Sequence, residues 1–433
     1  MSMELPPEIL GDIFEAQEFA RGHGIRNISE RREELLNCLD EEERSRLLEV
    51  EQKTENLVEG LMNLPEVKRL RQLRQLAGTT NVYEGQSPRG VGVMQPAFHS
   101  RYDHSELLAE QVKFAGVKLG LADDEIETMI ASAWLHDIGH PALSHLGDYF
   151  LEKKGRGDHE TRAVAAIQKK NSPISNLLAS ENINAEKVVE TILEKGYLGS
   201  VQSFCDTLSY LVVDSEMIKL PILPDQGAVL IKDLSGVDKK EGCLVVKDPK
   251  LWQMFLEVRA EMMKEVYLNP INRRQRGAMR HLMQIAINQD HLSLEDIEKG
   301  TDQSVEMRLQ SLVQYDPGAA IFGNRQENAP HLKKYIELWG LAHGEFSPEL
   351  WNRRMFDSRK ELEKYLFDNV KPDQLEQTVV VEPQDYTRKK LPVVDEKTGE
   401  KKVLKSHEVE LRDWDTKYIA YIPKFLSDPG RGK

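Results

Sequence analysis

Two stretches of sequence, Arg101-Tyr102-Asp103-His104 and His136-Asp137-Ile138-Gly139-His140, decide the predicted fold and chemistry of this 433-residue chain. His104, the His136-Asp137 pair and the later Asp206 together offer two imidazoles and two carboxylates. This ligand set favours iron, manganese or zinc over sites built from oxygen alone. The sequence therefore predicts a metal site, and such a metal indicates hydrolysis.

Additional histidines strengthen this prediction, because a single His-Asp dipeptide is common. Five of the chain's twelve histidines lie between His104 and His159. The further members of the group are His140, His145 and His159, with Asp148 among them. The alternative interpretation is a set of ordinary core or surface histidines, and it applies more readily to His140 or His145 taken singly than to the whole group.

Apolar residues at helical spacing indicate how these side chains are presented. One predicted helix begins near Arg101, so Arg101 and His104 lie in its first turn. A second runs from about residue 124 to 136 and is ended by Gly139 and Pro141, which places the His136-Asp137 pair at a helix terminus.

A third predicted helix carries Asp206, Tyr210 and Asp214 at positions i, i+4 and i+8. Its other positions are mainly apolar. A solvated face is the simpler explanation of the spacing alone, but a bound metal explains why an aspartate stands among apolar neighbours.

Composition narrows the class of protein. The 58 basic and 72 acidic residues give a net charge of −14, which disfavours nonspecific binding to nucleic acid or anionic membranes. Three cysteines match no metal-ligand spacing, no apolar run reaches membrane length, and the N-terminus lacks the features of a signal peptide. We expect a soluble cytoplasmic protein.

The pattern along the chain predicts three parts: an N-terminal helical extension (1–62), a catalytic core (63–290) and a C-terminal helical and β-rich lobe (291–433). Within the core, residues 227–246 predict a short hairpin between helices. Two basic runs, 68–76 and 273–276, fit either an exposed helix face or a phosphate-facing role. The predicted fold class is mainly α, with a small α+β C-terminal lobe.

From about Pro65 to Tyr267 the chain resembles the HD-domain phosphohydrolases. More narrowly, it resembles the deoxynucleoside triphosphate triphosphohydrolases, which include the SAM-and-HD-domain protein and the bacterial dGTPases. The resemblance implies an HD-domain helical bundle, here without a SAM domain, and a divalent ion that is Mg, Mn, Fe or Zn. The metal ligands that it implies are His104, His136, Asp137 and Asp206.

The narrower resemblance rests on the order and spacing of the added histidines and their acidic partner. The catalytic residues that it implies are Arg101, His140, His145, Asp148 and His159. The substrate-binding residues that it implies are Gln75, Leu76, Arg101, Tyr210, Asp214, Arg259, Lys264 and Tyr267. In this scheme His145, or alternatively His159, protonates the leaving 5′ oxygen.

The chain departs from the family pattern at several positions. Thr207 follows Asp206 where one relative has a phosphate-contacting lysine, and Asn269-Pro270 replaces a basic pair. Asn63 and Lys68 replace residues that in that relative bind a regulatory guanine nucleotide. The resemblance thus leaves open whether a nucleotide activator is needed, and control by GTP is not expected.

The resemblance implies metal-dependent hydrolysis of deoxynucleoside triphosphates to deoxynucleoside and inorganic triphosphate, by a homo-oligomer that does not bind membranes. Two alternatives stay open. The same site could act on another nucleotide, such as a monophosphate, a cyclic nucleotide or an alarmone. The chain could instead be a nucleotide-sensing protein with little turnover.

Overall fold

The computed structural model describes residues 28–75, 99–217, 226–267, 270–314, 351–370, 378–381, 390–405 and 417–423. Within them the chain is mainly helical, with a small set of strands that lies mostly toward the C-terminus, which confirms the predicted fold class. None of the described helices combines the length and the apolar content needed to cross a bilayer.

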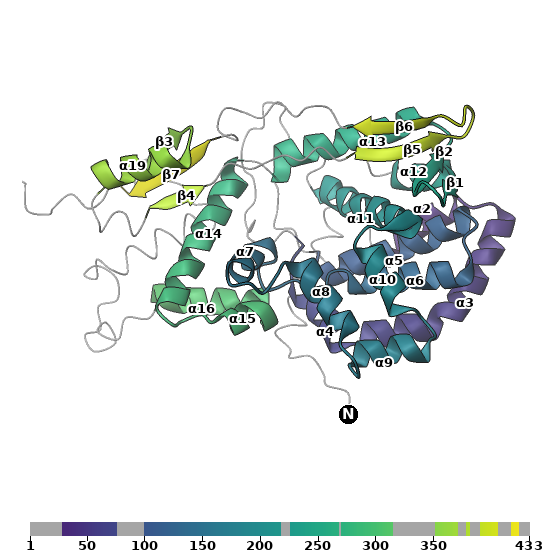
Figure 1. Cartoon of the computed structure of the whole chain (residues 1–433), viewed down its shortest axis with the longest axis horizontal. Coiled ribbons are helices and arrows are strands. Elements are labelled where there is room, and N and C mark those ends of the chain that lie inside the picture. Colours follow the sequence, from purple (N-terminus) through teal and green to yellow (C-terminus); the bar gives the residue numbers. More distant parts are fainter. Residues whose placement is uncertain are drawn as a thin grey trace, which may run out of the picture.

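The helical body extends from α2 to α13 (Figure 1). Its elements are α2 (Ile28–Leu36), α3 (Glu41–Asn63), α4 (Pro65–Arg69), the short 3-10 helix η1 (Leu70–Gln72), α5 (Arg101–Lys118), α6 (Asp123–Leu135), α7 (His145–Lys153), α8 (His159–Gln168), α9 (Pro173–Ser180), α10 (Ala185–Ile192), α11 (Gly196–Met217), α12 (Gln226–Asp233) and α13 (Pro249–Met262). A π-helical turn, η2 (Met263–Tyr267), follows α13.

Helix α5 is the centre of this body, and it packs against α3, α6 and α11. Its start is fixed by a capping box, in which the Ser100 side chain accepts the Asp103 amide while the Asp103 carboxylate accepts the Ser100 amide. The box makes Arg101 the first helical residue and puts His104 in the first turn, as predicted. Helix α6 ends at Leu135 with His136 as its C-cap, again as predicted.

A second helical unit consists of α14 (Pro270–Asn288), α15 (Leu294–Lys299) and α16 (Asp302–Gln314). It shares a hydrophobic core with α7, in which Leu146 and Phe150 pack with Met279 and Leu282. Of the two interpretations of the basic run 273–276, the exposed helix face is wrong, since Arg273 and Arg274 are 2% and 9% exposed. The phosphate-facing role stays a prediction.

The predicted hairpin is shorter than expected. Only β1 (Leu234–Asp238) and β2 (Cys243–Val246) form it, and residues 228–231, predicted as strand, lie in α12. Leu230 and Ile231 are fully buried, and a short buried apolar run has the same pattern in a helix as in a strand. Strands β5 (Lys390–Asp395) and β6 (Lys401–Lys405) extend the hairpin into a four-stranded sheet of order β1-β2-β5-β6, in which β2 and β5 are parallel.

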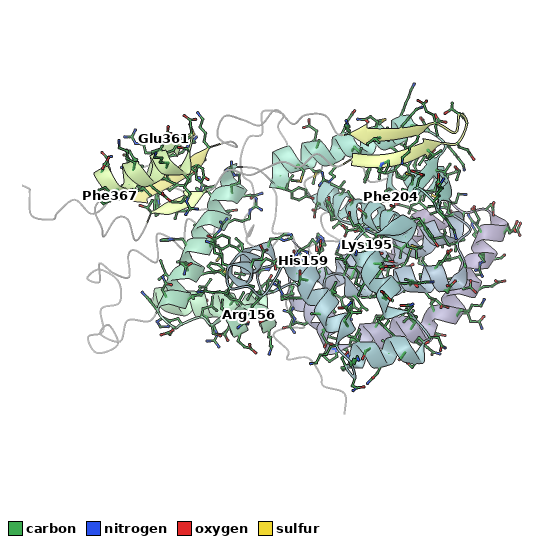
Figure 2. The ribbon with its side chains drawn as sticks, in the orientation of Figure 1. Arg156, His159, Lys195, Phe204, Glu361 and Phe367 are labelled. Carbon is green, nitrogen blue, oxygen red and sulfur yellow. The ribbon has the colours of Figure 1, made fainter. Side chains whose placement is uncertain are left out.

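The remaining strands form a separate antiparallel sheet of order β3-β7-β4, made of β3 (Trp351–Phe356), β7 (Tyr418–Pro423) and β4 (Val379–Val381). Helix α19 (Arg359–Asn369) covers one face through Leu362, while β4 lies beside α14 at Gly277. Figure 2 shows Phe367 at the outer side of this lobe and His159 near the middle of the molecule, between the two helical units. The site built around the histidines therefore lies away from the β3-β7-β4 sheet and α19.

Candidate metal centre and adjoining histidine cluster

The four predicted metal ligands come together from three helices. The Nε2 atoms of His104 and His136 lie 3.3 Å apart, and Asp206 Oδ1 lies 3.0 Å from His104 Nε2 and 3.7 Å from His136 Nε2. Asp137 Oδ1 lies 3.3 Å from His136 Nε2. Ligand atoms bound to one ion at about 2.1 Å are themselves separated by about 3 to 3.5 Å. The spacing of His104, His136 and Asp137 therefore fits a single divalent ion, and Asp206 lies beside the two imidazoles.

The second nitrogen of each imidazole is held by the protein. His136 Nδ1 lies 2.8 Å from the carbonyl of Ala133, which can only accept a hydrogen bond, so Nδ1 carries the proton. His104 Nδ1 lies 3.0 Å from Ser209 Oγ, and this hydroxyl donates its own hydrogen to the carbonyl of Asp206. Both Nε2 atoms therefore face the same point, the arrangement typical of metal-binding histidines.

The electrostatics of the site also suit a cation. Burial opposes ionisation of Asp137, but Arg101 and the neighbouring histidines outweigh it and hold the pKa of this carboxyl well below its usual range. Burial would lower the pKa of His104, yet the bond to Asp206 outweighs it and raises this pKa. Asp137 accordingly stays ionised beside the paired imidazoles.

Arg101 is in the site but is bound to protein groups. Its Nη1 donates to Asp137 Oδ2 at 2.6 Å, and its Nε donates to Ser144 Oγ at 2.9 Å. The side chain is 4% exposed. In this structure Arg101 neutralises and orients the metal-ligand carboxylate, and a direct phosphate contact stays a prediction.

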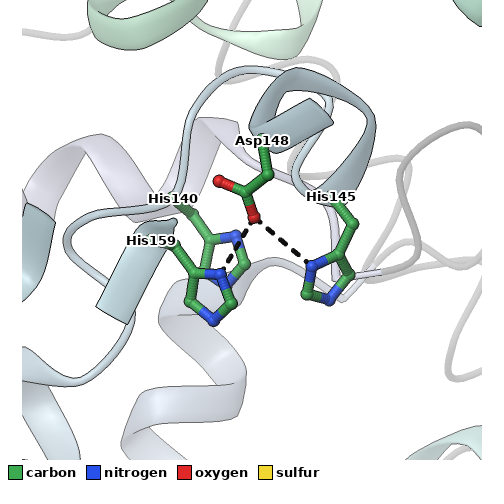
Figure 3. Close-up of side chains that lie close together, drawn as sticks. All are labelled: His140, His145, Asp148 and His159. Atoms are coloured by element: carbon green, nitrogen blue, oxygen red, sulfur yellow. Dashed lines mark hydrogen bonds and ion pairs between the residues drawn. The ribbon is translucent and has the colours of Figure 1, made fainter. Parts of the chain in front are cut away.

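A second cluster adjoins the first and consists of His140, His145, Asp148 and His159 (Figure 3). His145 and His159 are each the first residue of a helix. Asp148 Oδ2 accepts from His159 Nδ1 at 2.9 Å and lies 3.4 Å from His145 Nδ1. Figure 3 shows the other ring nitrogen of both His145 and His159 pointing away from Asp148.

This second cluster is poorly shaped for a metal, although all four ligand atoms lie within 4.8 Å of one another. The rings of His140 and His159 are stacked, with centroids 3.8 Å apart and planes inclined by only 21°. A nitrogen lone pair lies in the plane of its ring, so two stacked rings cannot both direct lone pairs at one ion. The cluster is better suited to holding and moving a proton.

Asp148 is the centre of the second cluster. Burial opposes its ionisation, but the bonds from His145 and His159 hold the pKa of Asp148 below its usual range. Its second oxygen accepts from Arg162, which also donates to the carbonyl of Gly139 at 3.0 Å. Arg162 thereby ties the cluster to the turn that follows His136-Asp137.

His140 joins the two clusters. Its Nε2 lies 3.2 Å from Asp137 Oδ1, and its Nδ1 lies 3.2 Å from Ser144 Oγ. The imidazole is 1% exposed, and burial together with Arg101 lowers its pKa well below the usual value, so it is neutral. The predicted catalytic histidines and the predicted metal ligands therefore form one continuous site.

Four predicted substrate-binding residues form a third group beside the candidate metal ligands, namely Tyr210, Asp214, Arg259 and Tyr267. Tyr267 donates through its hydroxyl to Asp214 Oδ2, and Arg259 Nε donates to the hydroxyl of Tyr210 at 3.2 Å. The rings of Tyr210 and Tyr267 meet edge to face, with centroids 6.2 Å apart. Burial raises the pKa of Asp214 to about 7.

Two predicted substrate contacts lie outside the described residues, namely Leu76 and the side chain of Lys264. Gln75 is described at the end of a short segment that bridges to His99, and its amide donates to the His99 carbonyl at 3.2 Å. The Gln75 side-chain oxygen is buried and has no hydrogen-bond partner.

Sequence reasoning missed Ser144, Arg162 and Ser209, which hold the ligands in place, and the buried His99. Arg162 and Ser209 stand three positions after His159 and Asp206, and this helical spacing is the only signal that could have indicated them. His99 Nδ1 lies 3.9 Å from Asp214 Oδ1, and neither atom has a hydrogen-bond partner. No local pattern predicts that pair.

Comparisons with known proteins agree with this fold. No protein-family model matches the chain. The uncharacterized protein YwfO of Bacillus subtilis (strain 168) is 26% identical over 230 residues, or 46% of this chain and 48% of the relative, so the chain spans about half the length of the curated relative it matches.

Among solved structures, a phosphohydrolase from Bacteroides thetaiotaomicron VPI-5482 superposes with a TM-score of 0.54 at 17% identity. The superposition covers 84% of this chain and 95% of that protein. The likeness extends well beyond the region of the sequence match. The chain therefore has the fold of that phosphohydrolase.

Proposed function

We propose that this protein is a metal-dependent phosphohydrolase that converts deoxynucleoside triphosphates to deoxynucleosides and inorganic triphosphate. The observation that carries the proposal is the junction at Asp137, whose Oδ1 lies 3.3 Å from His136 Nε2 and 3.2 Å from His140 Nε2. This junction joins a metal-binding set to a proton-handling cluster. Hydrolysis of a phosphoric ester needs both functions.

A divalent metal held by His104, His136, Asp137 and Asp206 would polarise a phosphoryl oxygen and lower the pKa of water. Arg101 keeps Asp137 ionised and oriented. The remaining predicted residues would supply the proton for the leaving group and bind the sugar.

The leaving 5′ oxygen needs a proton, and an imidazole is suited to give it near neutral pH. Asp148 orients both candidates through their Nδ1 atoms, so Nε2 is the atom that would carry the proton. His145 is the first candidate, because its side chain is 70% exposed and open to a substrate, whereas His159 is 20% exposed. His159 is the alternative.

The deoxyribose would lie against Tyr210, Asp214 and Tyr267. The hydroxyl of Tyr267 is already committed to Asp214, and Tyr210 is bonded to Arg259. A ribose 2′-hydroxyl in such a site would meet a ring or stay without a hydrogen-bond partner, and a site of this kind rejects it.

The experiment that tests the proposal is incubation of the protein with each deoxynucleoside triphosphate, singly and in pairs, with Mg²⁺ or Mn²⁺. Chromatography should find a deoxynucleoside and inorganic triphosphate. Turnover that appears only with pairs would show that a nucleotide activator is needed, and size-exclusion chromatography would test the proposed homo-oligomer. The double variant His136→Ala with Asp137→Ala should release no triphosphate while its circular dichroism is unchanged.

Other products separate the alternatives. Release of orthophosphate from a monophosphate, or opening of a cyclic nucleotide, in place of triphosphate release would assign the site to another nucleotide. Stoichiometric metal and tight nucleotide binding without turnover of any substrate would make the chain a nucleotide sensor.

A further inference from the structure

The turn between α6 and α7 contains strained backbone. Leu143 and Ser144 both have positive φ values, 58° and 53°, and ψ of Ser144 is −127°. Residues other than glycine rarely adopt this region, so the surrounding structure must hold the turn in it. Strain of this kind is common at functional sites, where it fixes a side chain in place.

The strained turn directs Ser144 into the site. Its Oγ accepts from Arg101 Nε at 2.9 Å and lies 3.2 Å from His140 Nδ1. Arg101 in turn bonds to the metal-ligand carboxylate of Asp137. Because His145 follows immediately and begins α7, the same backbone also sets the position of the proposed acid.

The group that holds this turn is the carboxylate of Asp302, the first residue of α16. Its Oδ1 accepts the amide of Leu143 at 2.7 Å, and its Oδ2 accepts the amide of Arg74 at 2.8 Å. The side chain is buried, at 2% exposure. One carboxylate thus connects the strained turn to the segment that contains Arg74 and Gln75.

Neighbouring hydrogen bonds hold the same turn. Ala142 donates its amide to the carbonyl of Ile297 at 2.8 Å. Arg69 donates to the carbonyl of Gly300 at 2.9 Å and also to the carbonyl of His140. Residues of α15 and α16 and the chain between them therefore hold the turn, Ile297 and Asp302 directly and Gly300 through Arg69.

We propose that Asp302 is a positioning residue, which fixes the Leu143-Ser144 turn against the Gln75 segment and so sets Ser144, Arg101 and His145 relative to the metal ligands. It touches neither metal nor substrate. Only a carboxylate offers an acceptor to both amides, since an amide side chain must turn its NH₂ group toward one of the two donors. The activity readout of this inference rests on the proposed function.

The test uses the full chain with the variant Asp302→Asn and the matched control Glu306→Gln. Glu306 lies on the same helix and, among the described residues, its carboxylate binds the Arg74 guanidinium, with Nη1 to Oε1 at 3.0 Å. We expect kcat of Asp302→Asn to fall about 10- to 100-fold, as for a small misplacement of reacting groups, with metal content unchanged. The control should stay within about twofold of wild type.

Two readouts distinguish positioning from general destabilisation. Hydrogen exchange should lose protection at the amides of Leu143 and Arg74 in Asp302→Asn, while amides of α5 and α6 stay protected. The double variant with Ser144→Ala should lose no more kcat than the worse single variant, because both changes act on one turn.

The proposal is overturned if Asp302→Asn keeps wild-type exchange at Leu143, if metal content falls with kcat, or if the losses of Asp302→Asn and Ser144→Ala multiply. Should the wild-type protein hydrolyse no nucleotide, the proposed function fails. The hydrogen-exchange measurement then still tests whether Asp302 holds the Leu143-Ser144 turn.

Discussion

The Nε2 atoms of His104 and His136 face each other at 3.3 Å, while the Nδ1 atoms of both rings are held by protein oxygens. Two neutral imidazoles in this tautomer present two lone pairs to each other, and the lone pairs repel. A cation, or an additional proton, between them removes the repulsion. The pair is therefore built for a positive charge at that point.

Metal binding should stabilise the folded protein measurably. Chelation should lower the Tm, and added Mn²⁺ should restore it, because a ligand that binds only the folded state shifts unfolding by mass action. Differential scanning fluorimetry measures the shift, and elemental analysis should find about one metal per chain. His136→Ala should lose both signals, whereas the exposed-site control His291→Ala should keep them. An unchanged Tm in the wild-type protein would count against the metal site.

Removal of the Asp148 carboxylate should impair the chemistry and spare the metal. Asp148→Asn loses the ionised acceptor for His159 and His145, so kcat should fall by about 100-fold or more, the size of a general acid's contribution. Steady-state kinetics with elemental analysis measures both quantities. Glu152→Gln, an exposed change on the same helix, is the control. Loss of metal from Asp148→Asn would instead place an ion in the second cluster.

The general acid should be identified by how each variant's loss of activity depends on the leaving group of the substrate. If His145 donates the proton, His145→Ala should lose much less activity on a p-nitrophenyl phosphodiester than on a nucleotide, because p-nitrophenolate departs without protonation. His159→Ala should lose similar factors on both substrates. The reverse pattern would assign the acid to His159. Equal losses in both variants would contradict a general acid in this cluster.

Gly139 should not tolerate a side chain. A Cβ at this position would lie 2.0 Å from the carbonyl oxygen of His159 and 2.6 Å from the amide nitrogen of Ala163, both of them backbone atoms of α8. We expect Gly139→Ala to destabilise the fold by about 1 to 3 kcal/mol and to lower activity, because α8 must move with His159. Urea denaturation measures the first effect. Gly236→Ala, where the nearest atom lies at 3.7 Å, should change little.

The stability of the protein should depend on Asp302 between about pH 4 and pH 6. Burial raises its pKa from 3.8 to about 6, against the opposing effect of the two amide donors. The folded state therefore binds this proton more tightly, and the free energy of unfolding falls as pH rises through this range and levels off above it. The full effect is about 3 kcal/mol. Urea denaturation should show that the free energy of unfolding of Asp302→Asn, relative to wild type, rises from pH 4 to pH 7. A difference that does not depend on pH would contradict the raised pKa of Asp302.

The sequence alone determined the local arrangement of the site. Helical spacing put Arg101 and His104 in the first turn of α5, and Asp206, Tyr210 and Asp214 on one helix, because these placements depend only on 3.6-residue periodicity and on capping. It also predicted the candidate metal ligands, since that set is defined by residue chemistry. It failed at residues 228–231, because a short buried apolar run has the same pattern in a helix as in a strand.

Only the tertiary structure decided which side chains share a contact. The stacking of His140 on His159, the bond of Arg101 to Asp137, and the reach of Asp302 to Arg74 and Leu143 join residues far apart in the chain, through distances that no spacing records. Each follows from a different packing: α5 against α6, α8 against the turn at Gly139, and α16 against the turn after α6. Periodicity determines which face a residue occupies, but helix packing determines what that face meets.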